Sequence, residues 1–147
     1  MKKFVLITIF FFLLTHSFCI AQCRQFTTKH CLPQLAGYIL AGQINSAPLY
    51  EGDVAELVLP LVRDNVYRIF ICSADNLGKV RFKLLDTERN ILFDNSTYNF
   101  TEYWDITTNS NRKLIVEVTV PKISATNSII QKGCVSIVVG YKAINSK

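Results

Sequence analysis

The stretch that decides the fold is Lys79-Val80-Arg81-Phe82-Lys83-Leu84, in which apolar side chains alternate strictly with basic ones. The stretch from Lys113 to Val120 repeats this alternation, with four apolar residues on one face: Leu114, Val116, Val118 and Val120. Successive side chains of a strand point to opposite faces, so both stretches predict strands with one buried face and one wetted face.

Five further runs have a similar period, over residues 53–61, 66–73, 90–94, 99–106 and 133–141. Clusters of Asn, Asp, Ser and Gly separate most of them, which is typical of turns. Seven short strands at fairly regular spacing predict an all-β domain, an antiparallel two-sheet sandwich of jelly-roll-like form.

The only helix that we expect is short and N-terminal, within residues 23–42 and centred on 33–41. Pro33 suits a first helical turn because its missing N–H would be unpaired there, and Gly42 is well placed to end a helix. Between them, Leu35, Tyr38 and Ile39 fall on one face.

Residues 1–21 have the layout of a secretory signal peptide. Lys2 and Lys3 precede an apolar run over residues 4–14, and Cys19-Ile20-Ala21 places small residues before a cut ahead of Gln22. The rival interpretation is a transmembrane anchor, which needs roughly 20 apolar residues, more than this run contains. We therefore expect residues 22–147 to form a single domain in the periplasm or outside the cell, with membrane contact only through the removed segment.

Charge offers little guidance to function. The whole chain has a formal net charge of +5, with 16 Lys and Arg against 11 Asp and Glu, and losing Lys2 and Lys3 leaves 14 against 11, or +3. Lys and Arg form no run, and nucleic-acid binding usually requires a clustered basic patch. We expect no nucleic-acid partner.

Four cysteines remain after the expected cut: Cys23, Cys31, Cys72 and Cys134. An even number in a small exported domain predicts two disulfides, whereas a zinc site would require a closer pair of ligands. Cys72 and Cys134 lie on the less apolar face of their strands. An N-terminal segment packed across that face would bring Cys23 and Cys31 each within reach of a strand cysteine.

A bridge between Cys23 and Cys31 within a continuous helix is unfavourable. Eight helical residues rise about 12 Å, whereas bridged Cα atoms lie within roughly 7 Å. Our hypothesis is that two bridges join the N-terminal segment to the sheet, with the pairing left open.

The order of the runs from Gly52 to Tyr141 resembles the jelly-roll-like sandwich of bacterial pre-peptidase C-terminal domains. The resemblance rests on Val66-Tyr67-Arg68-Ile69-Phe70-Ile71-Cys72, Tyr103-Trp104-Asp105 and the run from Lys132 to Tyr141. The chain is also similar to small uncharacterised exported proteins of Bacteroidetes-type bacteria. The resemblance implies an accessory or binding domain of the kind attached to secreted hydrolases.

No catalytic, cofactor or metal site is expected. His30 is the one histidine of residues 22–147, and it adjoins Cys31, whose thiol a disulfide would consume. Asp94, Glu102 and Asp105 are close in sequence and could act as a glycosidase pair or as calcium ligands. Acids are common in turns and at strand edges, however, and no calcium-loop signature accompanies them. We predict a protein that is not an enzyme.

Aromatic residues gather at Tyr98, Phe100, Tyr103 and Trp104. Phe100 and Trp104 share a strand face with Ile106, which is typical of a core strand. Tyr103 lies on the opposite face and is, with Tyr98, the better candidate for contact with a sugar or a partner.

A basic stripe, Lys79, Arg81 and Lys83, occupies the wetted face of one predicted strand. Such a stripe usually serves solubility or guards a sheet edge, and it could also contact an acidic partner or an anionic glycan.

We therefore expect a non-catalytic exported binding or interaction module for an unknown protein or glycan. The alternative is a small structural or assembly subunit of a cell-envelope complex, and a weaker alternative is a hydrolase that uses acidic residues.

Overall fold

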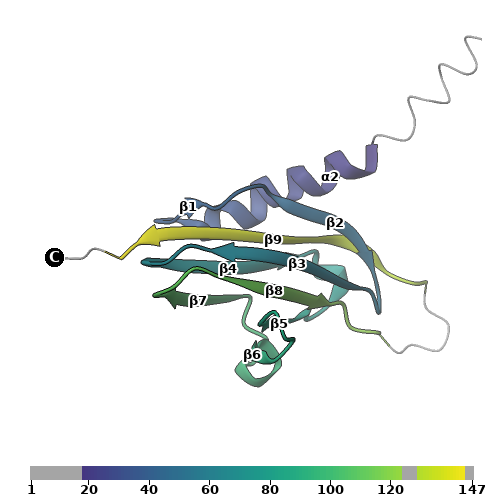
Figure 1. Cartoon of the computed structure of the whole chain (residues 1–147). Helices are drawn as coiled ribbons and strands as arrows, with labels where there is room; N and C mark the ends of the chain where they lie inside the picture. Colours follow the sequence, from purple (N-terminus) through teal and green to yellow (C-terminus); the bar gives the residue numbers. More distant parts are fainter. Residues whose placement is uncertain (1–17, 124–128, 145–147) are drawn as a thin grey trace, which may run out of the picture.

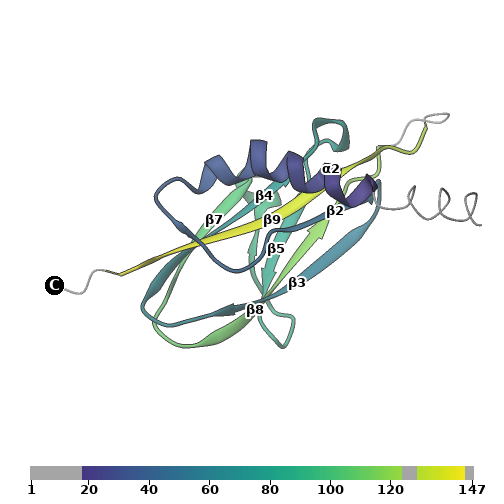
Figure 2. The same cartoon turned by 90° about the horizontal axis from the view of Figure 1, so that it is seen from above.

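Two antiparallel sheets face each other, and an N-terminal helical segment lies across the outer face of the larger sheet (Figures 1 and 2). The computed structural model describes residues 18–123 and 129–144. The five-stranded sheet, here sheet A, has the order β1–β9–β4–β7, and β2 also pairs with β9. The four-stranded sheet, sheet B, has the order β3–β8–β5–β6.

The strands of sheet A are β1 (Ile39–Leu40), β2 (Asn45–Tyr50), β4 (Asn65–Ser73), β7 (Tyr103–Thr108) and β9 (Lys132–Ala143). Those of sheet B are β3 (Val54–Leu61), β5 (Arg81–Leu85), β6 (Ile91–Asp94) and β8 (Arg112–Thr119). Two short 3-10 turns, η4 (Asp75–Leu77) and η5 (Asn95–Tyr98), follow β4 and β6. The predicted antiparallel two-sheet sandwich is confirmed.

The core lies between the sheets and uses the alternation seen in the sequence. Leu114, Val116 and Val118 of β8 are fully buried, whereas Lys113 of the same strand, on its other face, is exposed. Facing them from sheet A, Ile69 and Val139 are buried in the same cluster. Burial of these side chains is the main force that holds the two layers together.

All seven predicted strands are present. The structure has two further strands, β1 and β2, that the sequence analysis did not predict. β1 has only two residues, too few for a period to be recognised, and β2 contains Pro48 and polar residues that obscure the alternation. The strand expected over 99–106 begins at Tyr103, because Asn99 and Phe100 have left-handed backbone conformations (φ 53° and 55°).

The helix predicted at 33–41 is wrong in its bounds. The helical segment comprises α2 (Phe18–Phe26), a π-helical turn η2 (Thr27–Cys31) and a 3-10 turn η3 (Leu32–Leu35). It ends at Leu35, seven positions before Gly42, and Gly37, at φ 84°, lies in the turn that follows. Ile39, expected on the buried helix face, is instead in β1 and exposed.

Two disulfides fasten this segment to sheet A. Cys23 is joined to Cys134 in β9, and Cys31 is joined to Cys72 in β4. Beneath the segment lies a second apolar cluster that includes Phe70 and Val138. These are the bridges from the N-terminal segment to the sheet that the strand phases suggested.

The expected signal peptide lies mostly outside the described residues, since residues 1–17 are not among them. The expected cut ahead of Gln22 therefore stays a prediction. Within residues 18–123 and 129–144, no helix has the length and apolar character needed to cross a membrane.

Candidate functional site: the open side of the sandwich

The two long sides of the sandwich differ. On the side formed by β6 and β7, aromatic rings close the gap between the sheets: Phe93 stacks on Trp104 with ring centroids 4.1 Å apart. Tyr98 stacks on Phe93 at 5.1 Å. On the opposite side, β2 and β3 belong to different sheets, and the space between them is open.

β2 and β3 are joined by a tight turn from which they diverge. Asp53 N donates to Tyr50 O (3.1 Å), and Tyr50 N donates to the Asp53 carboxylate (2.8 Å). From this turn β2 runs along β9 of sheet A, while β3 runs along β8 of sheet B. The hairpin is therefore splayed, with its two strands in different layers.

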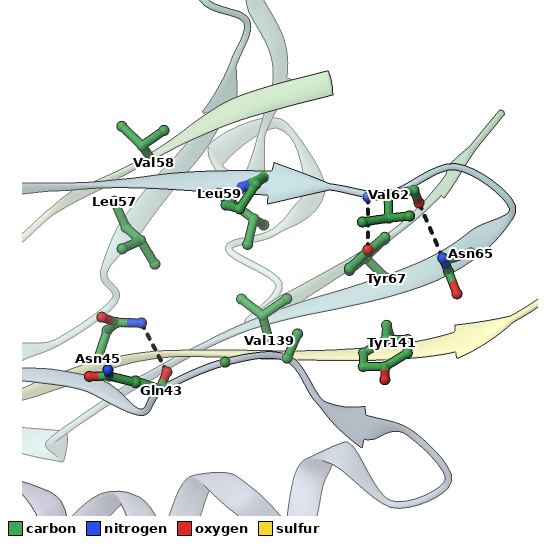
Figure 3. Close-up of a pocket in the computed structure, with 13 residues that line it drawn as sticks. Gln43, Asn45, Leu57, Val58, Leu59, Val62, Asn65, Tyr67, Val139 and Tyr141 are labelled. Atoms are coloured by element: carbon green, nitrogen blue, oxygen red, sulfur yellow. Dashed lines mark hydrogen bonds between the residues drawn. The ribbon is translucent and has the colours of Figure 1, made fainter. Parts of the chain in front are cut away.

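The splayed hairpin encloses a groove made of two hollows of about 530 and 300 Å³. Asn45 and Leu57 line both hollows, which makes the groove continuous. We call it the β2–β3 groove. In Figure 3, Leu57 and Val139 point into the gap from opposite sheets, whereas Val58 points away from it.

The floor of the groove is apolar and belongs to the core: Leu57, Leu59, Val118, Val135, Ile137 and Val139. The polar groups near it are mostly engaged within the chain. Tyr67 Oη accepts from Val62 N (2.9 Å), and Asn65 Nδ2 donates to Val62 O (3.2 Å), as Figure 3 shows. Glu56 is the one charged residue among those that line the two hollows.

The main-chain groups of β3 alternate between β8 and the groove edge. Val120 N donates to Asp53 O, so odd-numbered residues of β3 face β8 and even-numbered ones face the free edge. Pro60 is even-numbered, and its missing N–H therefore faces the edge. The same parity holds in β2. Glu51, directly after β2, donates its N–H to Gln131 O in the register of the β2–β9 pair, so odd-numbered residues face β9 and Pro48 faces away.

Both free edges thus carry a proline, a residue tolerated in sheets where no donor is required. These prolines reduce uncontrolled addition of further strands along the whole edge. The β3 edge from Val54 to Val58 keeps its donors and acceptors.

Tyr103, our leading contact candidate, lies elsewhere, on the outer face of sheet A. Its ring covers the Arg68 guanidinium at 4.6 Å, and Tyr38 covers the same group at 4.7 Å. Arg68 donates to both Asp105 oxygens at 2.8 and 2.7 Å, which lowers the pKa of Asp105. Tyr103 remains partly exposed, and its ring contact is with this ion pair.

The basic stripe is matched by acids and a ring within the chain. Arg81 forms an ion pair with Asp94, and this contact holds the pKa of Asp94 well below its usual range. Lys83 binds Glu117 at 2.7 Å, and Lys79 lies over the Phe100 ring. Arg81 and Lys83 are therefore largely neutralised by their neighbours.

The remaining candidates do not converge on one site. Asp94 is in sheet B and Asp105 is in sheet A, while Glu102 precedes β7 and is exposed. His30 is exposed and packs on Phe26. Among residues 18–123 and 129–144, no three His, Cys, Asp or Glu side chains group as metal ligands would.

Sequence reasoning did not find the β2–β3 groove. Its residues come from the segment before β2 and from β2, β3, β4, β8 and β9, and the pairing that leaves two edges unpaired is tertiary information. Pro48 and Pro60 were the one local signal, because proline in a strand indicates an edge.

The fold and groove define a two-sheet antiparallel sandwich with a disulfide-tethered N-terminal helix. It is similar to the crystal structure of PliG from Aeromonas hydrophila, a periplasmic lysozyme inhibitor of g-type lysozyme. The TM-score is 0.51 at 12% identity, over 73% of this chain and 90% of PliG. This similarity is one of fold.

No protein-family model matches the chain, and no curated protein sequence matches it. The resemblance to pre-peptidase C-terminal domains is therefore supported only as far as the β-sandwich architecture that it implied.

Proposed function

We propose that the protein is an exported, non-catalytic binding module that holds a segment of a protein partner in the β2–β3 groove. The observation that carries this proposal is the groove itself. Its floor is made of core side chains that lie at the bottom of the two hollows, because neither a strand nor an aromatic ring closes this side. Most of them are buried, and Leu57 is half-buried.

The character of the groove favours a protein over a glycan. Leucine and valine side chains line it. A partner that inserts apolar side chains removes its own apolar surface from water, together with that of the half-buried Leu57. Sugar binding would favour an exposed aromatic platform. Trp104 instead stacks on Phe93. Tyr98 and Tyr103 are exposed, but Tyr98 stacks on Phe93 and Tyr103 packs on Arg68, so they do not stack on each other as one platform.

The acids support a non-catalytic role. A glycosidase general acid needs a raised pKa so that it holds a proton near neutral pH. Arginine contacts lower the pKa values of both Asp94 and Asp105, which keeps these carboxylates ionised.

PliG, a sandwich of similar fold, is described as an inhibitor of g-type lysozyme. That description makes g-type lysozyme the first protein partner to test. The two disulfides fit work in an oxidising compartment such as the periplasm.

The test is calorimetric titration of purified g-type lysozyme with the oxidised protein of residues 22–147. We expect binding with a dissociation constant in the micromolar range or below, of order −8 kcal/mol. Asn45→Arg, which places a bulky cation where both hollows meet, should weaken binding at least about tenfold. Gln25→Arg introduces the same side chain on the exposed face of α2. It is the matched control and should bind as the parent does. Equal binding by both variants would contradict the groove as the site, and no heat with lysozyme would exclude that enzyme as the partner.

A further inference from the structure

The free edge of β3 carries a self-complementary pattern. Val54, Val58 and Val62 recur at every fourth position and are 58%, 59% and 57% exposed. Glu56 and Pro60 alternate with them on the same outward face. Rotation of the strand by a two-fold axis through Val58 exchanges Val54 with Val62 and Glu56 with Pro60.

We propose that β3 pairs antiparallel with β3 of a second copy about Val58, joining two copies of sheet B into one continuous sheet. In this register Val58 faces Val58 of the second copy and Val54 faces Val62. Glu56 faces the uncharged Pro60. Such an arrangement is isologous, with the same residues contributed by each copy.

Other registers of the same edge are unfavourable. Centring the pair on Glu56 sets two carboxylates directly opposite each other, and like charges in a cross-strand pair are destabilising. Centring it on Leu57 sets each Glu56 against a valine and desolvates the carboxylate. The register on Val58 avoids both costs.

The rows of side chains across sheet B also match in this register. The row of Val58 continues through Ile115, Leu85 and Ile91, so an apolar row meets its own copy at the two-fold axis. The row of Glu56 instead meets the row of Pro60, whose next member is Lys113. Glu56, which already binds Arg89 at 2.6 Å, would therefore lie in one row with Lys113 of the second copy, with Pro60 between them and about 10 Å between the two Cα atoms.

Main-chain pairing supports a short contact. The N–H and C=O of Val58 face the edge and can exchange hydrogen bonds with those of the second copy. Glu56 N–H can donate to the carbonyl of Pro60, which itself has no N–H to offer. Val62 donates no hydrogen bond to the second copy, because its N–H already binds Tyr67 Oη. A contact this short should be concentration-dependent rather than permanent.

The pairing uses the edge that also walls the β2–β3 groove. If the proposed function holds, a second copy at β3 and a partner in the groove would exclude each other, and self-association would regulate the binding site. The dimer itself is measured without any partner, so its failure leaves the groove proposal standing.

Sedimentation velocity of the oxidised protein across a concentration series tests the dimer. We expect a monomer–dimer equilibrium, which Val58→Lys weakens at least about tenfold. Ile91→Lys is the matched control because Ile91 has the same 59% exposure and lies in the same row at the opposite edge of sheet B. It should dimerise as the parent does. A monomer at every concentration up to about 1 mM, or equal loss in both variants, would overturn the proposal.

Charge exchange provides an independent readout of the register. Glu56→Lys alone should weaken the dimer, and adding Lys113→Glu should restore it, because the two positions lie in the same row across the axis, one strand apart from direct contact. Circular dichroism of each variant establishes that the sandwich is intact. No restoration in the double variant would reject the register on Val58.

Discussion

The hydroxyl of Thr27 lies 2.6 Å from the hydroxyl of Ser136, and both residues are fully buried between the N-terminal segment and β9. Thr27 also donates to Cys23 O at 2.7 Å, so Ser136 must be the donor to Thr27. This chain of hydrogen bonds orients the segment between its two disulfides.

Thr27→Val should lower the free energy of unfolding by roughly 1–3 kcal/mol, because Ser136 and Cys23 O lose a buried partner. Thr27→Ser keeps the hydroxyl and should cost less. Urea denaturation of the two variants measures the difference. Equal midpoints would mean that water replaces the lost partner.

Removal of the Cys31–Cys72 bridge by Cys31→Ala with Cys72→Ala should cost about 2–4 kcal/mol. Removal of Cys23–Cys134 should cost roughly 1 kcal/mol more on chain-entropy grounds, since it spans 111 residues against 41. Because the cluster under the helix is separate from the core between the sheets, both variants should keep their β-sheet circular dichroism. Loss of that signal at room temperature would contradict the division into two clusters.

Acid should destabilise the protein through Asp94 and Asp105. Arginine contacts lower both pKa values in the folded state, so their contribution is present above the unfolded aspartate pKa of about 3.9 and is lost as pH falls below it. The urea concentration at the unfolding midpoint should decrease as the pH is lowered from about 6 to about 3. Asp105→Asn should make this decrease less steep.

Glu88→Gln, which removes an exposed carboxyl outside these ion pairs, is the control for the acid titration. The effect of Asp105 should be modest, because its side chain is 36% exposed and solvent screens the pair. A slope unchanged by Asp105→Asn would show that the pair adds no pH-dependent stability.

Asn95 is a buried amide that ties β5 to the chain around η5. Its Oδ1 accepts from Phe82 N at 2.9 Å, and its Nδ2 donates to Val80 O and Thr101 O, each at 3.1 Å. Asn95→Ala should destabilise the fold by roughly 2–4 kcal/mol, because three main-chain groups lose their partner. Asn109→Ala, at an exposed turn, should stay within about 0.5 kcal/mol. Thermal unfolding of both variants checks the prediction.

The sequence predicted the strands wherever the two faces of a strand differ in polarity, as in the alternation from Lys113 to Val120. It failed at β2, where Pro48 and short polar residues leave no period to recognise. The helix was misplaced because Pro33 lies within a helical path that had already begun at Phe18, in a 3-10 turn rather than a first α-helical turn.

The candidate contacts illustrate a second limit. Lys79, Arg81 and Lys83 predicted a charged surface, and their neutralising partners come from β6, β8 and the segment before β7. The groove depends on which strand edges remain unpaired, and no local sequence pattern encodes this. Long-range pairing therefore decides both whether a charge is available and where the sandwich is open.

The most direct test of the account is site-specific photo-crosslinking in cells that export the protein. A photoreactive residue replaces Ala47, which is exposed at the groove, or Gln25, which is exposed on α2. We predict a covalent adduct with a different protein at position 47 that is absent at position 25. Equal adducts at both positions would contradict a protein partner in the β2–β3 groove. So would a result in which position 47 crosslinks to nothing, or only to a second copy of this chain.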